Sequence, residues 1–262
     1  MKQLSLVSNY FPLQPELKYR TNYYLEKKEL TDNIATSVVY YQFRMEQNFE
    51  IVPDGCIDVL YSLDPKKPEA MVCGSPISSR LFPLKTDHEY FGVKFFPSSY
   101  PMSEALNQAI PLTDLFKIDS TIIEQIADQE DFKQRINVFK RLFNKVLFNP
   151  ISSDDIQYSI NRIFTTKGKI SIEQLASEIG FSSRYLRKKF KEYTGISPKL
   201  FSQINRFQHS LYMLTETNEC SVWDIICENG YHDQAHLIHE FTNFGYLTPS
   251  KFIGFVHEKK SN

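Results

Sequence analysis

Basic side chains gather in one short stretch of this 262-residue chain, although the whole chain carries a formal net charge of −1. The stretch GFSSRYLRKKFKEYTG, residues 180–195, holds five of them: Arg184, Arg187, Lys188, Lys189 and Lys191. Arginine can hydrogen-bond guanine edges in a DNA major groove, and lysine binds guanine or phosphate. The alternative is a solvent-exposed helix face, which is what most runs of charge form.

A helix over residues 183–194 would separate these side chains from an apolar face. Leu186, Phe190 and Tyr193 recur at positions i, i+4 and i+7, so they predict the inner face of that helix. The basic residues that fall on the opposite side are Arg184, Arg187, Lys188 and Lys191. The pattern therefore predicts a helix that is held by one face and presents positive charge on the other.

The residues just before this stretch predict another helix. In SIEQLASEIG, Ser171 can cap the N-terminus and Gln174 can reach back to it. Gly180 suits the left-handed conformation that often ends a helix. The short link IGFS then leads directly into the basic helix. Helix, tight turn and helix together predict a helix-turn-helix, whose second helix enters the DNA major groove.

The same pattern occurs twice. IEQLASEIGFSSRYLRKKFKEYTGISPKLF recurs about 50 residues later as VWDIICENGYHDQAHLIHEFTNFGYLTPSKF. Gly180 matches Gly230, and Phe190 matches Phe241 after a one-residue insertion. Between the copies, SPKLFSQINRFQHSLYML predicts one long amphipathic helix, which would join two helix-turn-helix units into an all-α body. A structural repeat without a nucleic-acid role would share the apolar pattern, but it would not need the basic side chains.

The first half of the chain has the pattern of strands and loops. IATSVVYYQFRM, GCIDVLYSL and HEYFGVKFFP are rich in β-branched and aromatic residues, as strands are. Ile57, Val59 and Tyr61 alternate with Asp58 and Leu60, which predicts a strand with one packed face. The segment VPDGC between two of these runs is typical of a tight turn.

The apolar spacing becomes helical after Pro111 and continues to Phe148, where Asn149-Pro150 interrupts it. We therefore expect a domain boundary near residue 150. The predicted fold class is α+β. A mostly-β, barrel-like domain with helices at its end, residues 1–150, would sense a signal or dimerise. An all-α domain with two helix-turn-helix units joined by a long helix, residues 151–262, would follow it.

Composition excludes several other classes of protein. A sequence pI of about 6.6 argues against a general polyanion-coating role, so any nucleic-acid surface must be local. The N-terminus has no apolar signal segment, and no run approaches the ~18 apolar residues of a membrane span. We expect a cytoplasmic protein without membrane association, whose four cysteines are reduced.

Polar residues of the first half offer fewer candidate sites. His88 is the only histidine before residue 150, so we expect no multi-histidine metal site and no cofactor. Cys56 and Cys73 could form a redox pair, although strand cysteines more often pack as apolar residues. Asp54 and Asp58 flank the predicted turn and could face a pocket, and Asp54 is also suited to making the turn itself.

Aromatic residues provide two further expectations. Adjacent aromatic pairs occur in the first half at Tyr23-Tyr24, Tyr40-Tyr41 and Phe95-Phe96. These pairs would fill the core and the strand surfaces, or alternatively they would line a ligand cage. Trp223 lies near the start of the second repeat and is expected to pack.

These motifs resemble a known family. Residues 153–255 resemble the tandem helix-turn-helix DNA-binding domain of AraC/XylS transcriptional regulators, through GYHDQAHLIHEF followed by TP, and through SPKLFSQINRFQ as the connecting helix. The first half resembles the poorly characterised domain that precedes it in one branch of that family, through VPDGCIDVLYSL and FGVKFFP. The resemblance implies a small β-barrel sensor domain and double-stranded DNA as a partner.

The family's base-facing positions can be transferred to this chain one residue at a time. In the first recognition helix they fall on Arg184, Arg187 and Lys188, with Lys191 nearer to phosphate. In the second recognition helix they fall on Gln234, Ala235, His236 and His239. The resemblance therefore implies that both helices read bases.

The second helix departs from the family pattern at several positions. The family usually has arginine where this chain has His239, and Asp233 and Glu240 add negative charge. Tyr246 stands where the family often has a turn glycine, and the preceding Gly245 is expected to take over that turn. These departures weaken the prediction of base reading by the second helix.

Together the motifs predict a sequence-specific DNA-binding transcriptional regulator with two recognition helices that read adjacent major-groove segments. Its first domain would respond to a small-molecule or protein effector, form a homodimer, or do both. The alternative is a cupin-like enzyme or an adaptor that the second half only targets to DNA. A cupin-like enzyme would need metal ligands that are missing, and no nucleophile elbow, glycine-rich phosphate loop or zinc spacing occurs. A gel shift with competitor DNA separates these classes.

Overall fold

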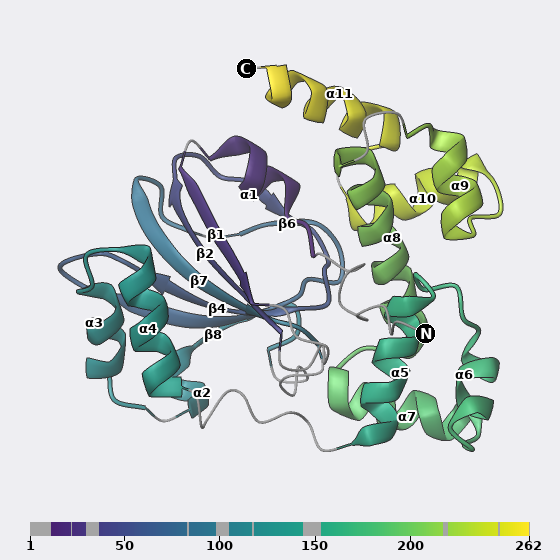
Figure 1. The fold of residues 1–262 in the computed structure, drawn as a ribbon, viewed down its shortest axis with the longest axis horizontal. Helices are drawn as coiled ribbons and strands as arrows, with labels where there is room; N and C mark the ends of the chain where they lie inside the picture. Colours follow the sequence, from purple (N-terminus) through teal and green to yellow (C-terminus); the bar gives the residue numbers. More distant parts are fainter. Residues whose placement is uncertain are drawn as a thin grey trace, which may run out of the picture.

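The computed structural model describes residues 12–21, 23–29, 37–82, 84–97, 105–116, 118–143, 153–216, 220–245 and 247–261. Two bodies are visible in Figure 1: a β-rich body up to residue 143, and a helical body from residue 153 onwards. The expected boundary near residue 150 lies outside the described residues. None of the described helices is long and apolar enough to span a membrane.

The β-rich body is built on an open sheet. Its strands are β1 (Tyr24–Glu29), β2 (Val38–Met45), β3 (Glu50–Ile51), β4 (Ile57–Ser62), β5 (Glu69–Gly74), β6 (Arg80–Leu81), β7 (His88–Phe95) and β8 (Ala109–Pro111). Six of the described strands form one antiparallel sheet in the order β1-β2-β7-β4-β5-β8, and β3 pairs with β6. Since β1 and β8 are not paired with each other, the expected barrel-like shape is met only loosely.

Alternation along the strands gives the sheet two different faces. Ile57, Val59 and Tyr61 of β4 belong to one core, which also contains Phe139. Leu60 belongs to a second core on the opposite face. Because successive side chains of a strand point to opposite faces, Asp58 lies on the side of Leu60. The side chains alternate between two faces as predicted, but the prediction of a single packed face is wrong, because both faces of β4 are packed.

Four helices accompany the sheet in the described part of this body: α1 (Pro15–Arg20), α2 (Leu112–Phe116), α3 (Thr121–Ala127) and α4 (Phe132–Phe143). Helices α3 and α4 cover one face in Figure 1, with α1 near the opposite side. Phe139 is fully buried in α4, and its ring lies 6.2 Å from those of Tyr40 and Tyr61. These aromatic contacts fasten the helices to the sheet.

The helical body contains α5 (Asp154–Thr165), α6 (Ile172–Glu178), α7 (Ser183–Thr194), α8 (Pro198–Glu216), α9 (Val222–Asn229), α10 (Gln234–Phe244) and α11 (Pro249–Ser261). Figure 1 shows α8 running from the group of α5, α6 and α7 to the group of α9 and α10. The predicted order of a β-rich part followed by two helical pairs and a joining helix is confirmed. This order supports the α+β fold class.

Side-chain caps and glycine turns define the two helical pairs. Ser171, Ser182 and Ser221 each accept a hydrogen bond from a backbone N–H in the first turn of their helix. Asp233 caps α10 in the same way. The turns between paired helices contain Gly180 with φ +71 and Gly230 with φ +70, a conformation that side chains with a Cβ disfavour. The repeated sequence therefore produces a repeated local geometry.

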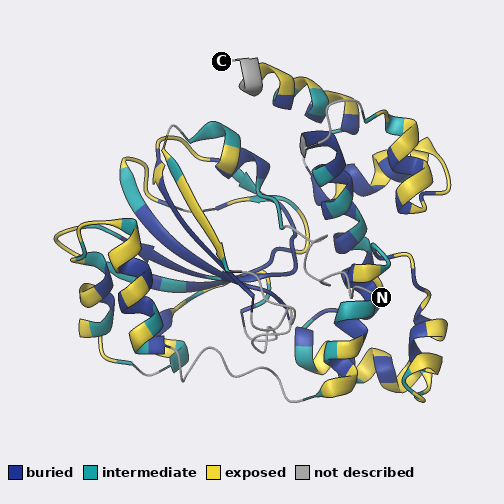
Figure 2. Cartoon of the chain, in the orientation of Figure 1, coloured by how far each residue is buried: buried dark blue, intermediate teal, exposed yellow. Residues whose placement is uncertain are grey.

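The two bodies share one hydrophobic cluster. It includes Val52, Cys56 and Phe96 of the β-rich body together with Phe201 of α8 and many other buried residues of the helical body. A Cβ placed on Gly55 would lie only 3.0 Å from a ring carbon of Phe201. Figure 2 shows extensive burial along α8. The joining helix is thus in direct contact with the turn that precedes β4.

Candidate nucleic-acid interface and ligand cavity

The first helix-turn-helix unit consists of α6 and α7. Leu186 and Phe190 are fully buried, as predicted, whereas Tyr193 is only partly buried. Thr194 is buried at the end of α7, where its hydroxyl donates to the carbonyl of Phe190 at 2.8 Å. The four predicted DNA-binding residues of this helix are all exposed: Arg184, Arg187, Lys188 and Lys191.

Two of these cations have acidic neighbours. Arg187 Nη2 lies 2.8 Å from Glu173 Oε1 of α6, and both side chains are more than half exposed. Lys188 Nζ lies 3.8 Å from Glu192. Exposed ion pairs contribute about 0–1 kcal/mol, so a DNA phosphate or base can replace these carboxylates as the partner.

The second helix-turn-helix unit consists of α9 and α10. Gln234, Ala235 and His239 are exposed. His236 is partly buried, because its ring lies edge-on to Tyr231 at 5.3 Å. Its Nδ1 accepts the backbone N–H of His232 at 3.3 Å, which leaves Nε2 to carry the ring hydrogen of neutral His236. This side chain can therefore offer a hydrogen bond without carrying a charge.

Glu240 does not add charge to the outer face of α10, in contrast to the expectation from its sequence position. Its carboxylate is buried and binds the guanidinium of Arg206 on α8 through two hydrogen bonds, one of them 3.0 Å long. The Arg206 guanidinium also lies over the Tyr231 ring, 4.9 Å from its centre. Glu240 is a structural residue that fastens α10 to α8.

Two further expectations for this unit are wrong. Trp223 does not pack, because 69% of its surface is exposed. Gly245 has φ −114 and ψ 154, an extended conformation, so it does not take over a left-handed turn. Tyr246 lies outside the described residues. Glycine is therefore not required at position 245 for its φ angle.

The outer faces of the two units differ at matching positions. Trp223 lies two residues after its N-cap, as Glu173 does in the first unit. Ile238 lies five residues after its N-cap, as Arg187 does, and 37% of its surface is exposed. Two exposed apolar side chains thus occupy the positions of the Glu173–Arg187 ion pair.

The β-rich body contains a cavity of about 120 Å³. One water molecule needs roughly 10–15 Å³ measured in this way, so the cavity can hold a small organic molecule. Aromatic side chains form much of its wall: Tyr24, Tyr41, Phe43, Phe49 and Phe82. Asp54, Asp58 and Lys94 are also among the lining residues. The cavity therefore combines apolar walls with a charged group.

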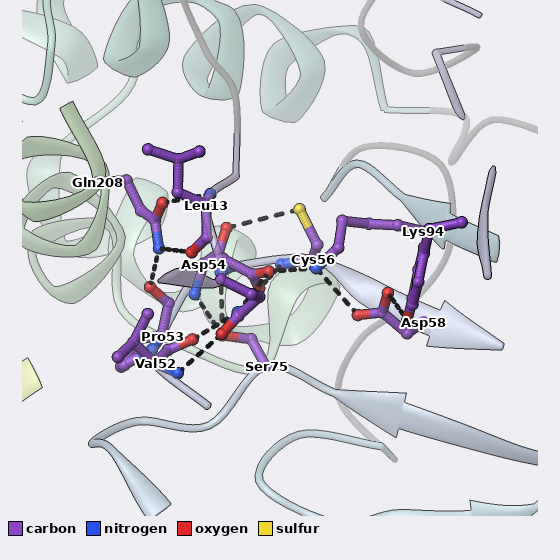
Figure 3. Close-up of polar contacts among 12 residues, drawn as sticks. Leu13, Val52, Pro53, Asp54, Cys56, Asp58, Ser75, Lys94 and Gln208 are labelled. Carbon is purple, nitrogen blue, oxygen red and sulfur yellow. Dashed lines mark hydrogen bonds and ion pairs between the residues drawn. The ribbon is translucent and has the colours of Figure 1, made fainter. Parts of the chain in front are cut away.

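The charged group is assembled across two neighbouring strands (Figure 3). Asp58 of β4 pairs directly with Lys94 of β7, whose ammonium lies 3.1 Å from Asp58 Oδ2 and also contacts Asp54 Oδ2. Asp54 Oδ1 accepts the backbone N–H of Cys56 at 3.0 Å, so Asp54 also makes the predicted turn. Asp54 and Asp58 thus both face the cavity.

Tyr41 completes this group because a glycine leaves space for its ring. Tyr41 of β2 pairs with Gly92 of β7, and a Cβ on Gly92 would lie 2.1 Å from the Tyr41 ring. The ring therefore crosses β7, and its hydroxyl donates to Asp58 Oδ1 at 2.7 Å. Without glycine at position 92, Tyr41 could not reach Asp58 in this way.

Burial and mutual attraction oppose each other in this group. Burial alone would lower the pKa of Lys94, but Asp54 and Asp58 raise it well above its usual value. Burial raises the pKa of Asp58, and Lys94 opposes that effect only in part. Lys94 is therefore a permanent cation, whereas the charge of Asp58 remains costly.

The turn beside the cavity is hydrogen-bonded to the helical body. Gln208 of α8 donates to the carbonyl of Pro53 at 2.7 Å and accepts the backbone N–H of Leu13 at 2.7 Å. Gln14, the next residue after Leu13, donates to Asp54 Oδ2 at 3.0 Å. Figure 3 labels Lys94, Asp54, Leu13 and Gln208 in this region. Two cavity-lining segments thus meet the helix that joins the DNA-binding units.

The other candidates of the first half have structural environments. Cys56 and Cys73 are buried free thiols, and burial raises the pKa of each well above its usual value, which disfavours a reactive thiolate. His88 hydrogen-bonds Thr86 and Asp64. Among the described residues, no group of three or more His, Cys, Asp or Glu side chains could hold a metal ion.

Some residues of the aromatic pairs line the cavity, and others pack in the cores. One member of each of the first two pairs, Tyr24 and Tyr41, lines the cavity. Tyr40, Phe95 and Phe96 belong to the hydrophobic cores. Sequence reasoning missed Lys94 and Arg206, although a lone cation in an apolar strand or helix was a usable signal. It also missed Gln14 and Gln208, for which the sequence carries no comparable signal.

Comparisons with known proteins agree with the helical geometry. Residues 175–254 match a family model described as a helix-turn-helix domain. The chain is 32% identical over 85 residues to an uncharacterised helix-turn-helix transcriptional regulator of Staphylococcus aureus, covering 32% of this chain and 11% of the relative. It is 29% identical over 103 residues to the lactose operon transcription activator of Staphylococcus xylosus, covering 39% and 37%.

Solved structures align with the chain at low similarity. ToxT of Vibrio cholerae aligns with a TM-score of 0.47 and 11% identity, covering 83% of this chain and 98% of that one. The chain spans only about a tenth of the length of the first of the curated relatives it matches. Residues 175–254, which match the family model, contain most of both helix-turn-helix units, with their glycine turns and the joining helix. Residues 175–254 therefore form a helix-turn-helix domain similar to those of these transcriptional regulators.

Proposed function

We propose that this protein is a sequence-specific DNA-binding transcriptional regulator in which α7 and α10 enter adjacent major-groove segments. One observation carries the proposal: the same capped helix pair occurs twice, and its first copy exposes four cations in a chain of net charge −1. Residues 1–150 would form the regulatory domain and residues 151–262 the DNA-binding domain. Both would act in the cytoplasm.

The proposed contacts differ in kind between the two recognition helices. Arg184, Arg187 and Lys188 face bases, and Lys191 faces phosphate, which gives the first helix most of the electrostatic attraction. In the second helix the contacts fall on Gln234, Ala235, His236 and His239. These residues offer hydrogen bonds and a methyl group, and so contribute more to discrimination than to attraction.

A footprint on the operator tests the two-helix arrangement. Recognition helices on one DNA face lie about 34 Å or 10 base pairs apart, so one protomer should protect about 20 base pairs. Operators would first be found by selection from random duplexes with the purified full chain. Protection of a single segment of about 5 base pairs would contradict the arrangement. A gel shift in which random competitor removes all binding would contradict sequence specificity.

The first domain is proposed to regulate DNA binding through α8. The cavity, the turn at Pro53 and the segment at Leu13 are joined to Gln208 by hydrogen bonds, and α8 sets the spacing of the two recognition helices. A ligand that displaces these segments would alter that spacing. The same domain could also form a homodimer, but the cavity favours a sensing role.

Gln208→Ala tests this route. The substitution removes the side chain that binds both segments, so amide exchange in α8 and operator affinity of the full chain should both change. Lys66→Ala, an exposed substitution in the β4–β5 loop, serves as the control and should change neither. Wild-type exchange and wild-type operator affinity in Gln208→Ala would exclude coupling through this contact.

A further inference from the structure

The charged group in the cavity carries an excess of negative charge. Asp54 has both carboxylate oxygens occupied, by Cys56 on one side and by Gln14 and Lys94 on the other. Asp58 shares the same Lys94 and otherwise receives the Tyr41 hydroxyl. Two carboxylates thus face one ammonium, and the group as a whole has a formal charge of −1 when both are ionised.

Asp58 is the member of this group that a ligand can reach. Its side chain is 17% exposed, compared with 2% for Asp54 and 8% for Lys94. Burial raises the pKa of Asp58, which means that its charge is only partly compensated in the protein. A bound cation would supply the missing compensation at the partly exposed carboxylate of Asp58.

Lys94 is a poor receptor for an anionic ligand. Its ammonium is buried and already binds two carboxylates. An organic acid or a phosphate that approached Lys94 would also come close to Asp54 and Asp58. The negative charge of such a ligand and those of the two carboxylates would repel each other strongly in a buried site. The cavity therefore selects against anions, although it contains a lysine.

The aromatic wall of the cavity suits the apolar part of a cationic ligand. Tyr24, Tyr41, Phe43, Phe49 and Phe82 provide ring faces and edges around the cavity. Aromatic faces attract cations and bury apolar groups. Three other charged residues among the lining are exposed to solvent: Lys18, Glu26 and Lys28. Glu26 and Lys28 form an ion pair of 3.0 Å and offset each other, whereas Lys18 adds one positive charge at the exposed side of the cavity, where solvent screens it.

We propose that the cavity binds a small organic cation, in which an ammonium group pairs with Asp58 and an aromatic or aliphatic body lies against the aromatic wall. The inference rests on the proposed function only for its regulatory consequence, since the binding itself requires no DNA. Occupancy would draw Asp58 and the adjacent turn toward the ligand. Through Asp54, Gln14 and Gln208 that movement would reach α8.

Three probes of matched shape test the charge preference in the wild-type full chain. Calorimetric titration would compare 2-phenylethylammonium, 2-phenylethanol and 3-phenylpropanoate, which share a phenyl group and differ in the charge of the polar end. The ammonium should bind at least about tenfold more tightly than the other two. Equal binding of the three probes, binding of none, or a preference for the carboxylate would overturn the proposal.

A matched pair of variants then locates the site. Asp58→Asn should reduce ammonium affinity about tenfold or more, whereas Asp64→Asn, outside the cavity, should leave it unchanged. Circular dichroism would establish that both variants are folded. If Asp58→Asn unfolds, Leu60→Phe replaces it as the test variant. Leu60 lines the cavity, so the larger phenylalanine side chain should block ammonium binding. Unchanged ammonium affinity in the folded variant that is used would overturn the assignment.

Operator binding separates this inference from the proposed function. Ammonium binding that depends on Asp58, together with an absence of any DNA binding, would uphold the ligand site and reject the regulator. Operator binding by the wild type, together with no preference for the ammonium probe, would uphold the regulator and reject the ligand site. If both hold, the ammonium probe should shift operator affinity in the wild type and fail to do so in Gln208→Ala.

Discussion

The two helix-turn-helix units share their inner residues and differ in their outer ones. Both begin each helix at a polar cap, turn at a left-handed glycine, and bury a leucine and a phenylalanine of the second helix. Outside, α7 presents four cations, whereas α10 presents histidines, a glutamine and Ile238. Packing of the helices restricts which residues can occupy the inner positions. At the outer positions, only the binding partner restricts the choice of residue.

This difference suggests a division of work between the units. The cations of α7 supply attraction to phosphate that does not depend on sequence. The second unit lacks these cations. Its Glu240 forms an internal ion pair with Arg206. The ion pair joins α10 to α8. A helix held in this way suits discrimination between DNA sequences by shape and by weak contacts. Substitutions that act on one unit but not on the other test this division.

The largest expected effect belongs to the buried ion pair of the second unit. Glu240→Gln would leave the buried Arg206 without its carboxylate, and breaking a buried pair costs about 3–5 kcal/mol. Glu173→Gln removes the exposed carboxylate beside Arg187 in the first unit and should cost less than ~1 kcal/mol. Urea denaturation of the full chain measures both free energies of unfolding. Equal losses would show that Glu240 is not buried as described.

A smaller effect is expected from the matching outer residues Arg187 and Ile238. Arg187→Ala should cost roughly 1–3 kcal/mol of operator binding and relax the preference at one base pair. Ile238→Ala should weaken operator binding without changing its dependence on salt, because no charge is lost. Anisotropy titrations over a range of salt concentrations distinguish the two. Equal losses of specific and random DNA binding in Arg187→Ala would reject its base-reading role.

Lys191 should affect only the electrostatic part of binding. If it faces phosphate, Lys191→Ala weakens binding to all sequences alike and lowers the salt slope by about one. Lys66→Ala, in the β-rich body, is the control for loss of a positive charge at a distance from the interface. An altered base preference in Lys191→Ala would instead place this side chain at a base edge.

Local sequence signals predicted the repeated geometry well, because caps, glycine turns and apolar spacing act within a few residues. They predicted the alternation of β4 for the same reason. The partners of Asp58 were not predictable, because Lys94 and Tyr41 reach it from other strands. The role of Glu240 was misjudged because Arg206 lies 34 positions earlier on α8. Trp223 was expected to pack on its residue type alone, and no local pattern identifies its exposure.

The smallest expected effect concerns how acid acts on the second unit. His209 of α8 lies 2.7 Å from Asn229 Oδ1 at the end of α9, and Asn229 Nδ2 donates to Ser210 at 2.8 Å, so His209 Nδ1 is the donor in the first contact. Burial lowers the pKa of His209, Lys167 lowers it further, and the bond to Asn229 opposes both only in part. The neutral imidazole therefore holds α9 to α8.

The sign of the pH dependence follows from this lowered pKa. The unfolded chain takes up a proton at His209 near pH 6.5, whereas the folded chain resists it, so stability falls as pH drops below about 6.5. His209→Gln keeps a hydrogen-bond donor toward Asn229 and removes the titration. Its urea midpoint should fall less than that of the wild type between pH 7 and pH 5, and hydrogen exchange should report the difference in α9 rather than in α6. Identical pH profiles would mean that other groups cause the acid sensitivity. A loss of protection in α6 rather than in α9 would place the acid-sensitive contact in the first unit.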